Sequence, residues 1–154
     1  MILHAKETGM TSPRIHIVTL GVSDLSLSRR FYEALGWKAS SASNEHIVFL
    51  KGGAGVLALY GRAALAEDAL TDDQPAGFRG VTLARNAGSK DEVDQWFATA
   101  VAAGARVVKP PQEVFWGGYS SYIADPDGHL WEFAFNPYFV FDEHGNLALP
   151  DETP

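Results

Sequence analysis

The sequence contains the same order of predicted elements twice. The triplet Val-Thr-Leu occurs at residues 18–20 and again at 81–83, each time in a run that is rich in β-branched residues and predicts a strand. Each strand precedes a predicted helix that ends at a glycine, Gly36 in the first copy and Gly104 in the second. Three further short strands are predicted after each helix. A chain that carries one βαβββ unit twice is expected to fold as two similar modules related by a pseudo-twofold axis.

These elements predict a first module at 14–70 and a second at 78–137 within one domain, joined by a polar Pro/Gly segment. Predicted strands cover 15–22, 37–41, 46–51 and 55–61, then 80–85, 105–108, 119–124 and 129–136, and predicted helices cover 25–36, 62–70 and 89–104. We expect the first helix to bury Leu27, Phe31 and Leu35. Residues 1–13 predict a flexible tail, and residues 138–154 predict a C-terminal tail with a short hairpin.

Composition excludes several classes of function. The 154 residues include no cysteine, which excludes disulfides, cysteine zinc sites, iron–sulfur clusters and thiol catalysis. The net charge is −7 and the basic residues form no stripe, so nucleic acid and anionic membrane are not expected partners. No run approaches the roughly 20 apolar residues that span a bilayer. We therefore expect a soluble, cytoplasmic protein.

The strand predicted after the turn sequence Asp-Pro-Asp-Gly carries one carboxylate in an apolar run. Its side chains alternate between two faces, because successive residues of a strand point to opposite sides of the sheet. One face holds His129, Trp131, Phe133 and Phe135, and the other holds Leu130, Glu132, Ala134 and Asn136. We expect the aromatic set to pack against a helix and Glu132 to lie on the opposite face.

Three features resemble one known family. They are the stretch TLGVSDLSLSRRFYEALGW at 19–37, the segment from Gly117 to the DPDGHLWEF stretch that ends at Phe133, and the repeat between them. Together they resemble the vicinal oxygen chelate superfamily, also called the glyoxalase/bleomycin resistance/extradiol dioxygenase superfamily. The resemblance implies an α+β fold in which two tandem βαβββ modules form a curved mixed β-sheet cup with helices on the outside. It also implies a homodimer and a small-molecule ligand in the cup.

The resemblance assigns four positions to a divalent metal in the metal-using relatives, one on the first and one on the last strand of each module. In this chain they are Ile17, Ala58, Gly80 and Glu132. His16 is one residue away from the first position, and a shift of one residue turns a side chain to the other face. Because three positions lack a ligand, we expect no metal cofactor. A metal remains the alternative, through a register error or a dimer that contributes His16 or His46.

The same resemblance predicts the ligand site. If the Asp-Pro-Asp-Gly stretch forms a tight turn, Tyr122 lies opposite Glu132, and extradiol dioxygenases carry a substrate-contacting tyrosine at the corresponding spacing. The loop with Trp116, Gly117 and Gly118 is expected to cover the cup. The predicted ligand-binding residues are Trp116, Tyr122, Ser120, Glu132, Leu130, Ile17 and Ala58, with Glu132 and Tyr122 as the candidate catalytic pair. Alternatively, Glu132 is an inherited ligand position that is now bonded to Tyr122 or water.

These observations favour a glyoxalase- or bleomycin-resistance-like protein that binds a small aromatic or amphipathic molecule without a metal. The alternatives are a metal-dependent lyase, isomerase or dioxygenase of the same superfamily, and metal-free acid–base catalysis by Glu132 and Tyr122. Arg79 and Arg85 flank the first strand of the second module, where they could meet an anionic ligand or remain solvated at the surface.

Overall fold

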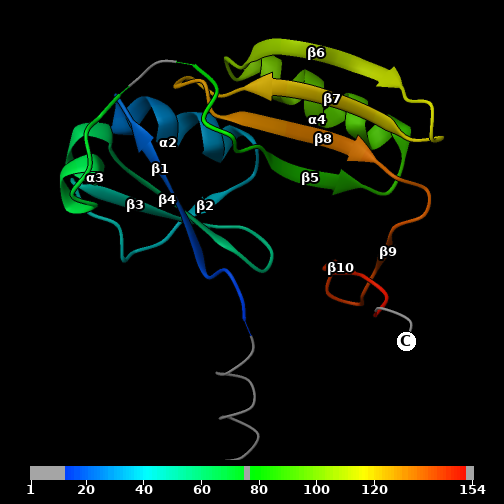
Figure 1. Cartoon of the computed structure of the whole chain (residues 1–154), viewed down its shortest axis with the longest axis horizontal. Helices are drawn as coiled ribbons and strands as arrows, with labels where there is room; N and C mark the ends of the chain where they lie inside the picture. The colour runs from blue at the N-terminus through cyan, green and yellow to red at the C-terminus, as the bar shows by residue number, and fades with distance from the viewer. Residues whose placement is uncertain (1–12, 75–76, 152–154) are drawn as a thin grey trace, which may run out of the picture.

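The computed structural model describes residues 13–74 and 77–151. The predicted tail at 1–13 lies outside these residues apart from Pro13, as do the last three residues of the predicted C-terminal tail. The first module contains β1 (Ile17–Val22), α2 (Leu25–Ala34), β2 (Lys38–Ala39), β3 (Ile47–Lys51), β4 (Val56–Gly61) and α3 (Arg62–Asp68). The second contains β5 (Leu83–Ala87), α4 (Lys90–Ala102), β6 (Arg106–Glu113), β7 (Tyr119–Ala124) and β8 (Leu130–Phe135). The two modules lie side by side (Figure 1).

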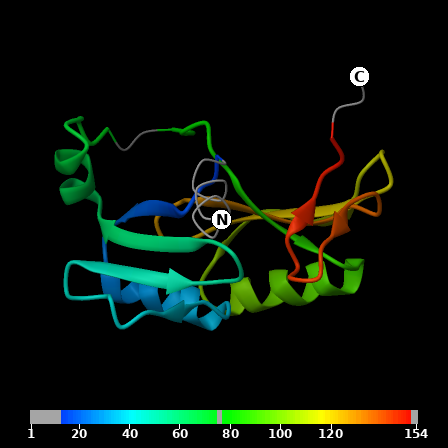
Figure 2. The same cartoon turned by 90° about the horizontal axis from the view of Figure 1, so that it is seen from below.

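Each module forms one four-stranded mixed sheet. The strand orders are β1-β4-β3-β2 and β5-β8-β7-β6, so the same topology occurs twice. β1 pairs with β4 and β5 with β8 in parallel, and the other pairs are antiparallel. The predicted α+β class with paired βαβββ modules is confirmed. Each module contributes its own sheet, and α2 and α4 lie along one side of the molecule (Figure 2).

Strand alternation separates a buried face from an open face in each sheet. In the first module the buried face carries Leu20, Val22, Val48, Leu50, Leu57 and Leu59. In the second, Trp131 and Phe133 are buried, and Phe133 makes an edge-to-face contact with Trp96 of α4. The predicted packing of the aromatic face of β8 against a helix is therefore confirmed. We use the term open face for the side of each sheet that lies opposite its helix.

The buried stripe of α2 differs from the predicted one. Asp24 caps the helix by accepting a hydrogen bond from Leu27 N at 3.0 Å, and Gly36 follows the helix with φ of 100°. The buried residues are Ser28, Phe31 and Tyr32, whereas Leu27 is 43% exposed. The reason is that α2 packs against both its own sheet and the second module, which turns Ser28 and Tyr32 inward.

The strand β6 is longer than predicted. It runs from Arg106 to Glu113 and includes Pro110 and Pro111, where the sequence predicted an end at Val108. Proline donates no backbone hydrogen bond, so it is tolerated at a sheet edge and at irregularities. β6 is an edge strand, and its pairing with β7 shifts register on both sides of Lys109.

The turn before β8 joins the two modules. Asp125 accepts hydrogen bonds from Asp127 N at 2.9 Å and His129 N at 2.8 Å through Oδ1, which closes the turn. Its Oδ2 accepts from the Tyr32 hydroxyl of α2 at 2.7 Å, and that hydroxyl accepts from Trp131 Nε1 at 3.1 Å. These groups are buried, so each would be costly to leave without a partner.

A second set of hydrogen bonds reinforces this junction. Asp127 Oδ1 accepts from the backbone and hydroxyl of Ser23, at 2.8 and 2.9 Å, and its Oδ2 accepts from Ser28 Oγ at 3.1 Å. His129 Nε2 lies 2.9 Å from Gly21 O. Polar groups of one turn therefore hold the second module against β1 and α2 of the first.

The C-terminal segment contains a two-stranded hairpin, β9 (Val140–Phe141) with β10 (Leu147–Ala148). Its turn includes Gly145 with φ of 81°, a conformation that glycine adopts without strain. Within the described ranges, no helix has the length and apolar character needed to cross a membrane.

Tyr32→Phe should destabilise the protein. The change removes one hydroxyl and leaves Asp125 Oδ2 and Trp131 Nε1 without their buried partner. We expect the free energy of unfolding to fall by about 2–3 kcal/mol, as is typical when a buried charged group loses a hydrogen bond. Chemical denaturation measures this change, and Tyr138→Phe is the matched control because Tyr138 is 76% exposed.

The loss of stability in Tyr32→Phe should depend on pH. Burial raises the pKa of Asp125, and the Tyr32 hydrogen bond acts in the opposite direction. A carboxyl whose pKa is raised in the folded state lowers stability as pH increases through that pKa. Removing Tyr32 strengthens this effect, so the destabilisation should be larger at pH 7 than at pH 4. Equal stability of Tyr32→Phe and the unmodified protein would contradict the proposed role of this junction.

Candidate functional site

Glu132 lies at the centre of a polar row across the second sheet. It is in the middle of β8, directly opposite Tyr122 of β7 and Ala84 of β5. Tyr122 in turn lies opposite Lys109 of β6. The predicted pairing of Tyr122 with Glu132 is confirmed. Side chains directly opposite each other in regular pairing share a face, so Tyr122 and Glu132 lie together on the open face. Lys109 extends this polar row by its backbone pairing with Tyr122, between two register shifts.

The electrostatics of this row favour a neutral phenol beside a carboxylate. Burial raises the pKa of Tyr122, and the negative charge of Glu132 raises it further because it opposes formation of a phenolate. Tyr122 therefore remains a hydrogen-bond donor and acceptor at neutral pH. Lys109 supplies donors, and Glu132 supplies an acceptor. Glu132 and Tyr122 are each partly exposed, so a ligand on the open face can reach them.

The other predicted ligand-binding residues differ in exposure and in position. Ser120 and Ala58 lie on the open faces by register but are only 4% and 0% exposed, so neither presents surface to a ligand in this arrangement. Ile17 is 48% exposed on the open face of the first module. Leu130 lines a cavity between the modules. The structure thus brings Tyr122 and Glu132 together and leaves Ile17 on the other sheet.

Trp116 lies away from Glu132. It belongs to the loop before β7, and its ring packs so closely on Gly118 that a Cβ there would lie 2.0 Å from ring atoms. The start of β7 at Tyr119 pairs with Phe135, and Tyr122 lies three residues further on, about 10 Å of strand. Gly118 is therefore needed to seat the Trp116 ring on its own loop.

Three cavities lie near the junction of the modules. The largest, about 820 Å³, is bounded by β1, α3, the described parts of the linker and the turn before β8, and Arg79 lines it. A second, about 460 Å³, follows the glycine-rich loop at 52–55, and a third, about 260 Å³, lies between α2 and α4. Of the residues described, neither Tyr122 nor Glu132 lines any of these three. Tyr122 and Glu132 are thus partly exposed side chains outside these three cavities.

The structure corrects the metal position assigned to Gly80. The strand predicted at 80–85 is observed as β5 at Leu83–Ala87, so Gly80, with φ of 76°, precedes the strand. The N-caps Asp24 and Ser89 are 65 residues apart, and so are Thr19 and Ala84, the first-strand residues that pair with Ala58 and Glu132, whereas the Val-Thr-Leu triplets are 63 apart. The counterpart of Ile17 is therefore Thr82. The triplet repeat was out of register by two residues.

A family model decides which family this chain belongs to. The model of the glyoxalase/bleomycin resistance protein/dioxygenase superfamily matches residues 14–133 of the 154. The chain belongs to this superfamily. None of the curated proteins matches the chain.

Solved structures of the superfamily agree with the fold. The chain is 34% identical to a glyoxalase-related enzyme from Fulvimarina pelagi, with a TM-score of 0.81 over 91% of this chain and 100% of that one. It is 25% identical to a hypothetical protein from S. aureus, with a TM-score of 0.71 over 82% and 95% of the two chains. It is 26% identical to a lactoylglutathione lyase from Agrobacterium tumefaciens, with a TM-score of 0.61 over 82% and 96%.

The donor set of this superfamily member does not fit a divalent ion at the four family positions. Those positions hold Ile17, Ala58, Thr82 and Glu132. Two are aliphatic, one is a neutral hydroxyl and one is a carboxylate, whereas divalent ions are held by several carboxylate or imidazole groups. Across residues 13–74 and 77–151, no group of three or more His, Asp or Glu side chains could hold a metal.

Two residues that matter here were missed from the sequence. Lys109 was not assigned to a strand because the prolines that follow it suggested that the strand ends before it. Tyr32 was not assigned to the core because the helical pattern indicated Leu27 and Leu35 instead. A Tyr next to the buried Phe31 was a weak signal for the junction, and no local pattern identified its partner Asp125.

The pKa of Tyr122 should depend on Glu132. Glu132→Gln removes a negative charge beside the phenol, so the pKa of Tyr122 should fall towards the ordinary tyrosine value. Titration of ¹³C-labelled tyrosine by NMR measures this pKa, and Tyr122→Phe assigns the resonance. Glu143→Gln, in the C-terminal hairpin, should leave it unchanged. An unchanged titration in Glu132→Gln would contradict the pairing of the two side chains.

Proposed function

We propose that this superfamily member binds a small aromatic or amphipathic molecule on the open face around Glu132, without a metal. The observation that carries the proposal is the pairing of Tyr122 with Glu132, which places a phenol and a carboxylate side by side on the open face, with Lys109 opposite Tyr122 on the edge strand. A ligand with both donor and acceptor groups can satisfy all three. The position of Glu132 in the sheet explains why an otherwise apolar strand carries a carboxylate.

The open face of the first module supplies the apolar surface that such a ligand needs. Its residues include Ile17, Ile47, Phe49, Val56 and Tyr60, which are all partly or largely exposed. The two open faces therefore differ in character, one apolar and one polar. A molecule with an aromatic ring and a polar substituent matches this combination.

The proposal includes a homodimer. In the single chain the polar row lies on an open surface, and water competes for its hydrogen bonds. A second copy that placed its apolar open face over the polar row would enclose the ligand and strengthen these interactions. The exposed Ile17 supports this arrangement, because an isolated sheet face that carries large aliphatic side chains gains from being covered.

Metal-free acid–base catalysis is the second candidate. It is favoured by the same pair, since Glu132 can accept a proton from a bound molecule while Tyr122 donates a hydrogen bond. Metal-dependent lyase, isomerase or dioxygenase activity is the remaining alternative. The similarity to a lactoylglutathione lyase supports metal-dependent activity, whereas the donor set at the four family positions argues against it.

Ligand binding should require Glu132 and Tyr122. In a saturation-transfer NMR screen of one- and two-ring aromatics with hydroxyl, amine or carboxyl groups, we expect some to bind. Glu132→Gln and Tyr122→Phe should weaken these by about tenfold or more, the loss expected for a charge-assisted hydrogen bond. Glu143→Gln is the control. The hits that these two changes weaken are the ones assigned to the open face, and a screen in which neither change weakens any hit would contradict the proposed site.

The metal alternative is tested on the same protein. Elemental analysis of untagged protein and a thermal-shift panel of Ni, Mn, Fe and Zn are expected to show no stoichiometric metal. A bound transition metal, or a large stabilisation that Glu132→Ala abolishes, would overturn the metal-free proposal.

The proposed dimer predicts a sedimenting mass of twice 16.7 kDa. Ile17→Glu should shift the protein towards the monomer, because it places a charge on the face that the partner would cover. Leu70→Glu is the matched control, since Leu70 is exposed at the end of α3. Sedimentation velocity distinguishes the two forms. A monomer at all concentrations would contradict the dimer.

A further inference from the structure

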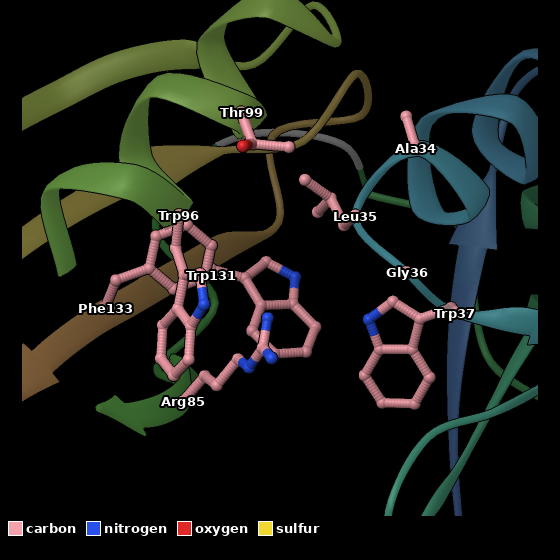
Figure 3. A pocket seen from close by; sticks show the side chains of 9 residues that line it. All are labelled: Ala34, Leu35, Gly36, Trp37, Arg85, Trp96, Thr99, Trp131 and Phe133. Atoms are coloured by element: carbon pink, nitrogen blue, oxygen red, sulfur yellow. The ribbon is translucent and has the colours of Figure 1, made fainter. Parts of the chain in front are cut away.

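The cavity of about 260 Å³ lies on the opposite side of the sheets from Glu132. It is bounded by the end of α2 from Ala34 to Trp37, by Trp96 and Thr99 of α4, and by Arg85, Trp131 and Phe133 (Figure 3). Arg85 lies opposite Phe133 in the pairing of β5 with β8, so both are on the helix side. The cavity is therefore distinct from the polar row on the open face.

Three tryptophans form its walls. Trp37 and Trp131 meet edge to face with ring centroids 6.2 Å apart, and Trp96 packs on Phe133 in the same manner at 6.1 Å. Figure 3 shows the Trp131 ring between those of Trp96 and Trp37, with the Arg85 side chain reaching toward it. Each wall presents an aromatic surface that suits a planar ring.

These walls are held in place by contacts outside the cavity. Trp131 donates through Nε1 to the buried hydroxyl of Tyr32. Trp37 packs so closely on Gly52 that a Cβ there would lie 2.5 Å from the indole. A site whose walls are fixed before binding loses less entropy when a ligand enters.

Arg85 supplies the polar group of the cavity. Its guanidinium carbon lies 3.7 Å from the centroid of the Trp96 ring, a cation–π contact. No ion pair or hydrogen bond joins Arg85 to the other described residues. Glu92 is the acidic neighbour, and its Oε1 accepts a hydrogen bond from Gly88 N at 3.2 Å.

The charge of Arg85 persists at neutral pH. Partial burial lowers the pKa of the guanidinium and Glu92 opposes that change, but arginine remains protonated in proteins at neutral pH. Arg85 lines the cavity and is also exposed to solvent, so its N–H donors, which have no acceptor among the described residues, are free to bind a ligand there. A carboxylate is the group whose two oxygens match this planar fork.

We propose that this cavity binds a small planar aromatic carboxylate, with the ring against the aromatic walls and the carboxylate on Arg85. The volume admits about one ring with a short substituent, since pockets for larger drug-like ligands start near 300 Å³. Arg85 disfavours cations, and a flexible aliphatic acid uses the flat indole surfaces less well than an aromatic ring does. The cavity of about 460 Å³ shares Trp37, Arg85 and Trp131 with this one, and it provides room for a substituent towards the loop at 52–55.

Benzoate is the probe that tests the proposal. We expect saturable binding by isothermal titration calorimetry and quenching of tryptophan fluorescence. Benzamide, which keeps the ring but lacks the charge, and cyclohexanecarboxylate, which keeps the charge but lacks the flat ring, should both bind at least about tenfold more weakly. Equal binding of benzamide and benzoate would overturn the role of Arg85.

Variants locate the binding site. Arg85→Gln should weaken benzoate about 10- to 100-fold, the range expected when charge-assisted hydrogen bonds are lost. Arg85→Lys should weaken it less, because the charge remains while the planar fork is lost. Arg30→Gln, on the exposed surface of α2, and Trp116→Phe, outside the cavity, should leave both affinity and quenching unchanged. Circular dichroism checks that each variant is folded.

The same titrations separate this site from the proposed ligand site on the open face. Glu132→Gln and Tyr122→Phe should keep full benzoate affinity. Benzoate binding that persists in Arg85→Gln but is lost in Glu132→Gln would assign the probe to the open face and overturn the cavity proposal. No saturable binding of benzoate at millimolar concentration would overturn it as well.

Discussion

The hydrogen bond from Tyr32 to Asp125 links two halves of the molecule that share no sheet. Each module has its own four-stranded sheet, so no backbone ladder holds one against the other. The bond from Tyr32 joins α2 of the first module to the turn before β8 of the second, and Trp131 joins the same hydroxyl. Because these hydrogen bonds are buried, losing them is costly, and they therefore favour one relative arrangement of the two modules. The positions of β8 and of both surfaces of its sheet depend on this junction.

The strand β8 connects the two proposed sites because its side chains alternate. Glu132 lies on the open face with Tyr122, while Trp131 and Phe133 lie on the helix side, where Trp131 both completes the junction and forms a wall of the small cavity. A single strand thus carries a polar surface on one side and an aromatic one on the other. A substitution in β8 is expected to affect mainly the face on which its side chain lies, because the sheet backbone separates the two.

Sequence reasoning recovered the features that depend on local pattern and failed where distant segments meet. The repeated modules, the helix ends at Gly36 and Gly104 and the two faces of β8 follow from spacing alone. The choice of Gly80 was wrong because an identical triplet occurs two residues out of register, which only strand pairing reveals. Leu27 was expected in the core but is exposed, whereas Tyr32 is buried. The reason is that the second module covers a side of α2, which the pattern of the helix alone does not show. The strand containing Lys109 was predicted too short because Pro110 and Pro111 suggested an end. They are tolerated because β6 is an edge strand, and the position of a strand in its sheet cannot be read from the sequence.

By itself, the amino-acid sequence determined the family, the class of fold and the pairing of Tyr122 with Glu132. The family follows from the resemblance of its motifs, and the fold class and the pairing depend on periodicity and on one tight turn, which act over few residues. Only the tertiary structure decided which residues Asp125 and Arg85 meet, that Ser120 and Ala58 are covered, and that a cavity forms between α2 and α4. The physical reason is that burial and side-chain partners are set by packing between elements that are separate in the sequence, and no local pattern encodes which elements meet.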